Sequence, residues 1–354
     1  MRAVAFALAI LATILTLSLA SLPSHAQVSV TFRETWVSSA GADHNPCSRS
    51  QPCRTLERAH ELTSPGGRIG IIDAGNYGGL QITKAISIIN DGSGVAILST
   101  SQLGGPVRIA AGANDQIHLR GLTIDGSDGG IAGINFGTGG ALHIQNSVIK
   151  SFRASIPVPF RPGASEVTHG IRFTPAARSE LYISDTLIIG NGNTASASYG
   201  ILIQPGSAGL ASAVLNRVQL ENNLNGLGVD GSLSRIRVEA VTGPIERHPL
   251  LGVHVSLLGS VIAGHAGIGV MALSTTAIAA AGVRTVVVMV RSASLNNGVG
   301  LVVDGLRASL RVSESTITGN GTGLLATNNG RLFYSLTNSI SENRIAIDEP
   351  PSNQ

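Results

Sequence analysis

The clearest hydrophobic pattern in the chain is a short alternating run that stops at a turn and starts again. In segment 310–326, Leu310 and Val312 alternate with polar residues, which is the pattern of a half-buried strand. Asn320-Gly321 then breaks the run, because both residue types accommodate the left-handed backbone conformation of tight turns. A second strand is expected at 323–326. The segment therefore predicts a strand, a turn and a second strand.

The start of that second strand is a motif that recurs: a glycine, an aliphatic residue, any residue and an apolar residue. The copies begin at Gly133, Gly170, Gly200, Gly226, Gly267, Gly300 and Gly323, and a copy without glycine begins at Arg344. Successive copies lie 21 to 41 residues apart. Constant strands with connections of variable length are typical of a solenoid of stacked coils.

The turn before each motif is expected to carry an amide side chain at one fixed position. Counting six residues from the polar residue at the end of the preceding strand places these residues in the same turn: Asn191, Asn222, His265, Asn297, Asn320 and, one residue early, Asn343. Stacked coils bring equivalent residues together, so these side chains are expected to form a ladder of hydrogen bonds. Asparagine is also common in isolated turns, and only the recurrence favours a ladder.

The first 26 residues have the composition of an export signal. Arg2 precedes the apolar run 3–20, and Ser24 to Ala26 is a small-x-small cleavage motif. Residues 1–26 are therefore expected to be a signal peptide, and the mature protein is expected to be secreted or periplasmic. A membrane anchor is the alternative, but the run is short for a spanning helix, and no later segment is long and charge-free enough to span a bilayer.

The two cysteines of the chain, Cys47 and Cys53, lie close together ahead of the repeats. In an exported protein such a spacing favours a local disulfide. A metal site would need more ligands, and a redox pair is normally the tighter Cys-x-x-Cys. The segment Pro52 to Thr63 reads as a short amphipathic helix that would cap the open end of the solenoid.

These features divide the chain into four parts. We expect a signal peptide at 1–26, an N-terminal segment with the disulfide loop and the capping helix at 27–66, stacked coils at 67–347 and a C-terminal tail at 348–354.

Composition and charge narrow the possible partners. Forty-four glycines and 43% hydrophobic residues fit a repetitive β protein with many turns rather than a disordered chain. The net charge of +3 falls to +2 without Arg2, and no basic run exists, which argues against nucleic acid as a partner. The positive charge is almost all arginine, which pairs well with carboxylates, so an anionic polysaccharide remains a possible partner.

The order of these elements resembles a known family. The loop CSRSQPC, the helix, the segment PGGRIGIIDAGNYGGLQITKAISI and the glycine coils with Asn turns are similar to bacterial right-handed parallel β-helix repeat proteins of the pectin-lyase-like superfamily, over residues 34 to 347. The resemblance implies an all-β fold, a right-handed, single-stranded parallel β-helix with three sheets. Many members of that superfamily are polysaccharide lyases, hydrolases or esterases, and many have no demonstrated activity.

Insertions at two corners of neighbouring coils are where a groove is expected, because function usually lies on such loops. One corner holds 153–169 and 192–199, and the other holds 230–254 and 271–286. The candidate saccharide-binding residues are Arg153, Arg161, Glu166, His169, Arg172 and Tyr182 at the first corner and Glu246, Arg247 and His248 at the second. The alternative is that these are ordinary solvated loop residues. Outward apolar positions at Leu215, Leu258, Val288 and Val290 are expected to be covered by the inserted loops or by an oligomer contact.

No catalytic centre can be assigned from the sequence. Hydrolysis of glycosides needs two carboxylates at a fixed separation, and lyase chemistry needs a base with a cation or arginine, whereas the acids here are dispersed. Asp125 and Asp128 superficially resemble a calcium loop, but their glycines favour a turn. We therefore expect no cofactor and no metal. The first hypothesis is an exported binding or structural protein, and the alternative is a polysaccharide lyase or hydrolase with an unrecognised site.

Overall fold

The structure, a computed structural model, describes residues 31–154, 167–193, 197–234, 252–274 and 283–348. The expected signal peptide and residues 349–354 of the expected tail lie outside these ranges. Across the described ranges, no helix is long and apolar enough to cross a membrane.

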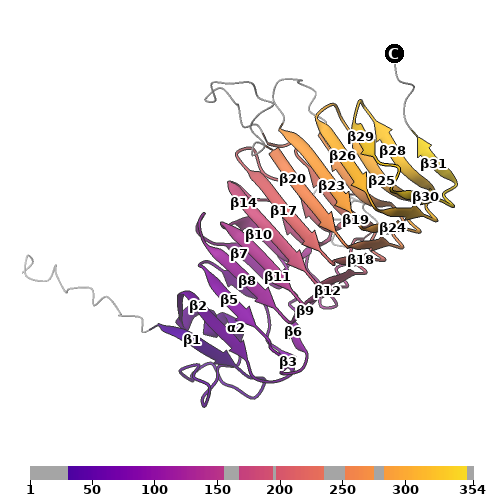
Figure 1. Cartoon of the computed structure of the whole chain (residues 1–354). Helices are drawn as coiled ribbons and strands as arrows, with labels where there is room; N and C mark the ends of the chain where they lie inside the picture. Colours follow the sequence, from indigo (N-terminus) through magenta and orange to yellow (C-terminus); the bar gives the residue numbers. More distant parts are fainter. Residues whose placement is uncertain (1–30, 155–166, 194–196, 235–251, 275–282, 349–354) are drawn as a thin grey trace, which may run out of the picture. The chain divides into compact units, whose positions relative to one another are not determined.

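Three parallel sheets, here named A, B and C, contain the strands (Figure 1). Sheet A consists of β1 (Phe32–Val37), β2 (Thr63–Ile71), β5 (Ile86–Ile89), β8 (Gln116–Arg120), β11 (Ala141–Gln145), β14 (Arg178–Ser184), β17 (Leu210–Asn216), β20 (Gly252–Leu258), β23 (Arg284–Val290), β26 (Ala308–Ser313) and β29 (Arg331–Tyr334). Sheet B consists of β3 (Gly75–Asn76), β6 (Ala96–Leu98), β9 (Leu122–Asp125), β12 (Val148–Lys150), β15 (Leu187–Ile189), β18 (Gln219–Glu221), β21 (Val261–Ala263), β24 (Ala293–Leu295), β27 (Thr316–Thr318) and β30 (Ser339–Ser341). Sheet C consists of β4 (Leu80–Ile82), β7 (Val107–Ala110), β10 (Ala132–Thr138), β13 (His169–Phe173), β16 (Tyr199–Ile203), β19 (Asn225–Asp230), β22 (Ile268–Leu273), β25 (Val299–Asp304), β28 (Thr322–Thr327) and β31 (Ile345–Asp348).

β1 pairs with β2 in sheet A. From β2 onward the chain visits sheets A, B and C in turn, and each strand from β2 to β28 pairs with the strand three places later. Side chains alternate along every strand, so one set of aliphatic residues from each sheet meets in a single core. In β14, for example, Leu181 and Ile183 are buried while Tyr182 faces outward. The fold is a right-handed parallel β-helix, which confirms the fold class expected from the sequence.

The turn from sheet B to sheet C carries a hydrogen-bonded column of amide side chains. Asn191 Nδ2 donates to Asn223 Oδ1 across 2.9 Å, and the Nδ2 groups of Asn297 and Asn320 donate in the same way to Asn320 and Asn343. His265 occupies the column between Asn223 and Asn297. We call this column the amide ladder.

The amide ladder passes through Asn223 and not through Asn222, so the expectation for Asn222 is wrong by one residue. The count started from Asn216, the residue type expected at a left-handed strand end, whereas Arg217 holds that position with φ of 53°. A slip of one residue turns every side chain to the opposite face. The same slip made Leu215 an outward residue, and the structure buries Leu215 in the core and turns Val214 outward.

The repeated glycines leave the space that the amide ladder fills. A Cβ on Gly200 would lie 2.9 Å from Asn223 Nδ2, and one on Gly170 would lie 3.0 Å from Asn191 Nδ2. In the coil of β22, the glycine equivalent to Gly226 is Gly269 and not the expected Gly267. The register shows this, because Leu227 pairs with Val270 and Gly228 pairs with Met271. The glycine motif and the Asn turns are therefore one structural device.

A second column of polar side chains, at the turn from sheet A to sheet B, was not predicted. The backbone N–H groups of Val218, Ser260 and Ser292 donate to the hydroxyl groups of Ser260, Ser292 and Ser315, over 3.0 to 3.2 Å. These hydroxyl groups satisfy amides that the tight turn would leave without partners.

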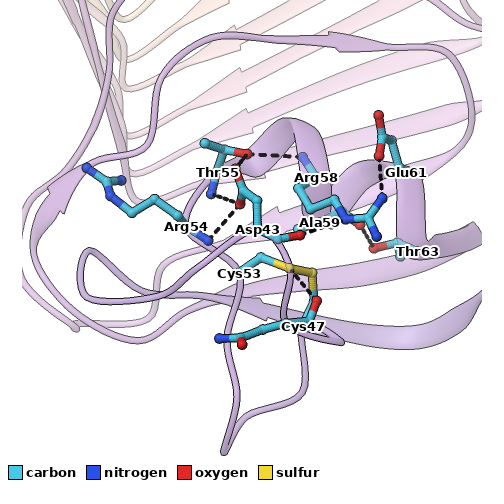
Figure 2. A network of polar contacts seen from close by, with 10 residues as sticks. Asp43, Cys47, Cys53, Arg54, Thr55, Arg58, Ala59, Glu61 and Thr63 are labelled. Carbon is cyan, nitrogen blue, oxygen red and sulfur yellow. Dashed lines mark hydrogen bonds and ion pairs between the residues drawn. A yellow bond between two sulfur atoms is a disulfide. The ribbon is translucent and has the colours of Figure 1, made fainter.

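The N-terminal end is closed by the disulfide loop and by α2 (Leu56–Leu62) (Figure 2). The Cys47–Cys53 disulfide confirms the expected pairing. Thr55 caps α2 by accepting a hydrogen bond from the Arg58 N–H over 3.2 Å, and Asp43 accepts from the N–H of Thr55 over 2.9 Å. Helix α2 is shorter than the expected segment, and β1 extends sheet A into the part assigned to the cap.

Candidate functional site

The insertions predicted at the two corners both adjoin sheet C. The chain enters β13 and β16 after the insertions at the first corner, and it leaves β19 and β22 into those at the second. These four strands are neighbours in sheet C. The described part of sheet C between the two sets of loop ends is therefore where a groove can form.

A pocket of about 220 Å³ lies on the outer face of these four strands. We call it the sheet C pocket. It is lined by Val167, His169, Arg172, Ala197, Tyr199, Leu202, Gln204, Gly228, Val229, Asp230, Met271 and Leu273. Its volume is slightly below the roughly 300 to 1,000 Å³ of small-molecule sites, so the described walls enclose room for about one ring-sized group.

The floor of the pocket is a column of paired residues from successive coils. Arg172 is in register with Leu202, Leu202 with Gly228, and Gly228 with Met271. The Tyr199 ring lies against Gly228, so closely that a Cβ on that glycine would come within 2.7 Å of the ring. The Tyr199 hydroxyl group donates to Met271 Sδ across 3.4 Å. The floor thus presents an apolar surface with an arginine at one end.

Gln204 and Asp230 form a polar pair at the ends of two adjacent strands. Gln204 Nε2 donates to Asp230 Oδ2 across 2.7 Å. Burial and, second, the charge of Asp230 raise the pKa of Tyr199, so the phenol stays protonated. Both members of the pair keep hydrogen-bonding capacity for the hydroxyl groups of a ligand.

His169 is almost fully buried, with 1% of its surface exposed. Its Nδ1 accepts the N–H of Tyr199 across 3.1 Å. Burial, followed by the nearby charge of Arg172, lowers the pKa of His169 to about 3, so the ring is neutral and carries its proton on Nε2. That Nε2 is buried and has no hydrogen-bond partner among the described residues. Such an unmatched donor is costly unless a ligand or water accepts from it.

Arg172 supplies the positive charge of the pocket. It is half-buried on β13, and the described ion pairs give it no acidic partner. A guanidinium group can bind a carboxylate through two parallel hydrogen bonds. Arg172 and the Gln204–Asp230 pair thus border an apolar floor, and His169 lies beside them with its Nε2–H buried. This arrangement is suited to a ligand with hydroxyl groups and one negative charge.

The structure does not bring all the predicted site residues together. His169 and Arg172 line the sheet C pocket. Arg153 lies instead at the turn from sheet B to sheet C, where its Nε and Nη2 donate to the carbonyl oxygens of Gly190 and Asn222 over 2.5 and 3.3 Å. Arg161, Glu166, Glu246, Arg247 and His248 lie outside the described residues.

Tyr182 was assigned to the same corner as His169, but it lies on the outer face of sheet A. Its ring stacks on His143 with centroids 4.7 Å apart, and His143 stacks on His118 at 4.4 Å. The Tyr182 hydroxyl group donates to Glu180 across 2.7 Å. The three rings are stacked at the same position of adjacent coils, away from the sheet C pocket.

Asp125 forms the turn that its glycines favoured. It accepts hydrogen bonds from the N–H and hydroxyl groups of Ser127 over 3.0 and 2.6 Å, and it pairs with Lys150 at 2.9 Å. Within the described part of the chain, no three His, Cys, Asp or Glu residues are grouped so as to hold a metal ion.

The pocket residues that the sequence analysis missed are Tyr199, Gln204, Asp230 and Met271. Met271 was missed because the coil of β22 was aligned on Gly267. Gln204 and Asp230 directly follow the motifs that begin at Gly200 and Gly226, and the alignment of these motifs already places the two residues side by side. Nothing in the sequence indicates that the Tyr199 ring lies over Gly228.

Neither a family model nor a curated protein matches this chain. Two solved structures are similar to it. Pectate lyase Pel9A has 12% identity and a TM-score of 0.46, with 89% of this chain and 80% of that chain covered. A rhamnogalacturonan lyase has 13% identity and a TM-score of 0.34, with 83% and 72% covered. The fold assignment rests on the strand pairing, and the activities in these names belong to those two proteins.

Proposed function

We propose that the protein binds an acidic polysaccharide, with one uronic acid unit held in the sheet C pocket. The observation that carries this proposal is that Arg172, to which the described ion pairs give no acidic partner, lines the same pocket as His169, whose buried Nε2–H has no acceptor among the described residues. Two donors, one of them charged, suit a carboxylate. The apolar floor suits the less polar face of a sugar ring, and the Gln204–Asp230 pair suits its hydroxyl groups.

The described lining favours binding over glycoside hydrolysis. Hydrolysis uses two carboxyl groups about 5 to 10 Å apart. Asp230 is the one carboxylate among the described lining residues, and Gln204 already donates to it. The lowered pKa of His169 and the raised pKa of Tyr199 leave neither group in the state of a general base that works near neutral pH.

A polysaccharide lyase is the second candidate. Arg172 is the feature that favours it, because an arginine beside the carboxylate of a uronic acid stabilises the charge that develops when the neighbouring proton is removed. In such a reaction Asp230, the carboxylate of the described lining, would accept that proton, and the Tyr199 hydroxyl group would donate one to the leaving oxygen. Such a protein would bind the same saccharides and also cleave them.

An array of neutral, uronic acid and sulfated polysaccharides, followed by a product assay, tests the proposal. We expect retention on uronic acid polymers, weaker retention on their methyl esters, and neither reducing ends nor unsaturated products. Unsaturated products that disappear in Arg172→Gln would establish the lyase. Equal retention on neutral and acidic polymers would contradict the proposed ligand class.

We also infer that the protein acts outside the cytoplasm. The Cys47–Cys53 disulfide supports this location, because such bonds persist in oxidising compartments. The export signal expected at 1–26 supports it as well. N-terminal sequencing of the protein from the culture fluid and the periplasm tests both parts, and the expected first residue is Gln27.

A further inference from the structure

The sheet C pocket has a charged end and an apolar end. One column of outward positions holds, one coil apart, Arg172, Leu202, Gly228 and Met271. Successive coils are about 4.8 Å apart, so the backbones of Arg172 and Met271 are separated by roughly 14 Å. The positive charge of Arg172 is therefore confined to one end of the pocket, and a thioether lines the other end.

A second column of outward positions lies two residues further along the same coils. It holds Gln204, Asp230 and Leu273, and the last two are in register. Met271 and Leu273 are half-buried on β22, and the Tyr199 hydroxyl group donates to Met271 Sδ across 3.4 Å. We call Met271, Leu273 and the Tyr199 ring the apolar corner of the pocket. Asp230 thus has an amide on one side and the apolar corner on the other.

The Asp230 carboxylate retains free acceptor positions. It accepts from Gln204 Nε2 across 2.7 Å and from the Ser232 N–H across 2.8 Å. A carboxylate offers about four acceptor positions. The described ion pairs give Asp230 no basic partner. A ligand must therefore present a hydrogen-bond donor beside Asp230, and its own negative charge must lie at the Arg172 end.

We propose, as a step that rests on the proposed function, that the acidic sugar in the sheet C pocket also carries an acetamido group. The carboxylate of the sugar binds Arg172, and the acetamido N–H donates to Asp230. In a planar trans amide the N–H and the methyl group lie on the same edge. The hydrogen bond to Asp230 therefore directs the methyl group toward Leu273, which is in register with Asp230. A hydroxyl group in place of the amide would leave the apolar corner in contact with water.

The size of the pocket requires both groups on the same sugar ring. Its volume of about 220 Å³ has room for about one ring-sized group and not for two neighbouring rings. The ligand class is therefore a 2-acetamido-2-deoxyuronic acid or a related acidic sugar with one acetamido group. A polymer in which plain uronic acids alternate with acetamido sugars would fill the pocket less well.

Calorimetric titration of the protein with two pairs of tetrasaccharides tests the proposal. One pair consists of galacturonic acid units with and without a 2-acetamido group, and the other pair consists of the corresponding glucuronic acid units. In at least one pair we expect the acetamido member to bind at least about tenfold more tightly, as a methyl-sized group in a hydrophobic pocket does. A hyaluronan tetrasaccharide, with acetamido groups on the rings next to glucuronic acid, should bind no more tightly than the glucuronic acid tetrasaccharide.

A matched pair of leucine variants locates the preference. Leu273→Asn makes the apolar corner polar, so this variant should bind the two members of the preferred pair equally. Leu325 is also a half-buried leucine at an outward position of sheet C, in the column of Met271 but outside the pocket. Leu325→Asn should therefore keep the full preference for the acetamido member.

The outcomes separate this proposal from the proposed function. Equal binding within both pairs, tighter binding of hyaluronan, or the same preference in both leucine variants would overturn the acetamido assignment. The proposed function would stand in each of these cases, because the plain uronic acids would still bind. If no acidic tetrasaccharide binds, the proposed function is contradicted and the acetamido assignment falls with it.

Discussion

Asn223 donates its backbone N–H to His265 Nδ1 across 3.1 Å, so an imidazole stands where the other described members of the amide ladder have a carboxamide. A carboxamide at this position also donates to the preceding coil, as Asn223 Nδ2 does to the Ile188 carbonyl across 2.9 Å. His265 Nε2 is buried without a hydrogen-bond partner among the described residues. His265 is therefore the weak member of the amide ladder.

Replacing this histidine with asparagine should stabilise the fold. His265→Asn should restore the hydrogen bond to the preceding coil and remove the unmatched Nε2–H, so we expect the free energy of unfolding to rise by about 1 kcal/mol. Urea denaturation followed by circular dichroism measures the change. Asn320→Ala, which removes a ladder member, should lower the same quantity by about 1 to 3 kcal/mol. A destabilised His265→Asn would show that the imidazole suits the ladder better than an amide.

The protein should lose stability in mild acid. Burial lowers the pKa of His60 and of His265 to about 4 and that of His169 to about 3, from 6.5. The unfolded chain therefore binds more protons than the folded one between pH 6.5 and pH 4, so stability is full above pH 6.5 and falls as the pH drops through this window.

Urea midpoints at pH 7, 5.5 and 4.5 measure this loss. Each buried histidine contributes a slope of at most about 1.4 kcal/mol per pH unit. His265→Asn should show a shallower decline than the original chain. Constant midpoints between pH 7 and 4.5 would mean that these rings are not held neutral by burial.

Removing the disulfide should destabilise the N-terminal end. Cys47 and Cys53 are fully buried and close a short loop that pairs with β1. The chain-entropy model gives a cost of about 2 kcal/mol for opening a loop of this length. The double variant Cys47→Ala/Cys53→Ala should therefore melt earlier than the oxidised protein, and reductant should have no effect on it. Equal melting of the oxidised and double-variant proteins would exclude a stabilising role.

Gly228→Ala should impair saccharide binding more than it impairs folding. The added Cβ would lie 2.7 Å from the Tyr199 ring, so the ring must leave the pocket floor. We expect binding of a uronic acid oligosaccharide to weaken at least about tenfold, or about 1.4 kcal/mol. Gly137→Ala in β10 is the control, because its Cβ would meet nothing closer than 3.7 Å. Equal affinities of the two variants would show that the Tyr199 ring does not contribute to saccharide binding.

The sequence predicted the fold well, because one periodic pattern encodes it. The spacing of the glycine motifs and the recurrence of Asn are consequences of a single stacked coil, and both survive insertions between coils. The local register was harder to predict. Arg217 takes a left-handed conformation usually held by Asn or Gly, and Gly267 and Gly269 both fit the motif, so two coils were misaligned.

The candidate site was only half visible in the sequence. His169 and Arg172 were found because they adjoin an insertion, whereas Tyr199, Asp230 and Met271 come together only when three coils are stacked in the correct register. Tyr182 was misplaced because residues near in sequence in a β-helix can belong to different sheets. Contacts between coils depend on register, and register depends on single residues at the turns.

Calorimetric titration with a uronic acid tetrasaccharide and with its carboxyl-reduced counterpart tests whether the sheet C pocket recognises a carboxylate. We predict that the acidic sugar binds and that the carboxyl-reduced sugar binds at least about tenfold more weakly. Arg172→Gln should weaken the acidic sugar alone, whereas Arg108→Gln, two coils earlier in the same column of sheet C, should have no effect. Equal binding of both sugars, or unchanged binding by Arg172→Gln, would contradict recognition of a carboxylate by Arg172.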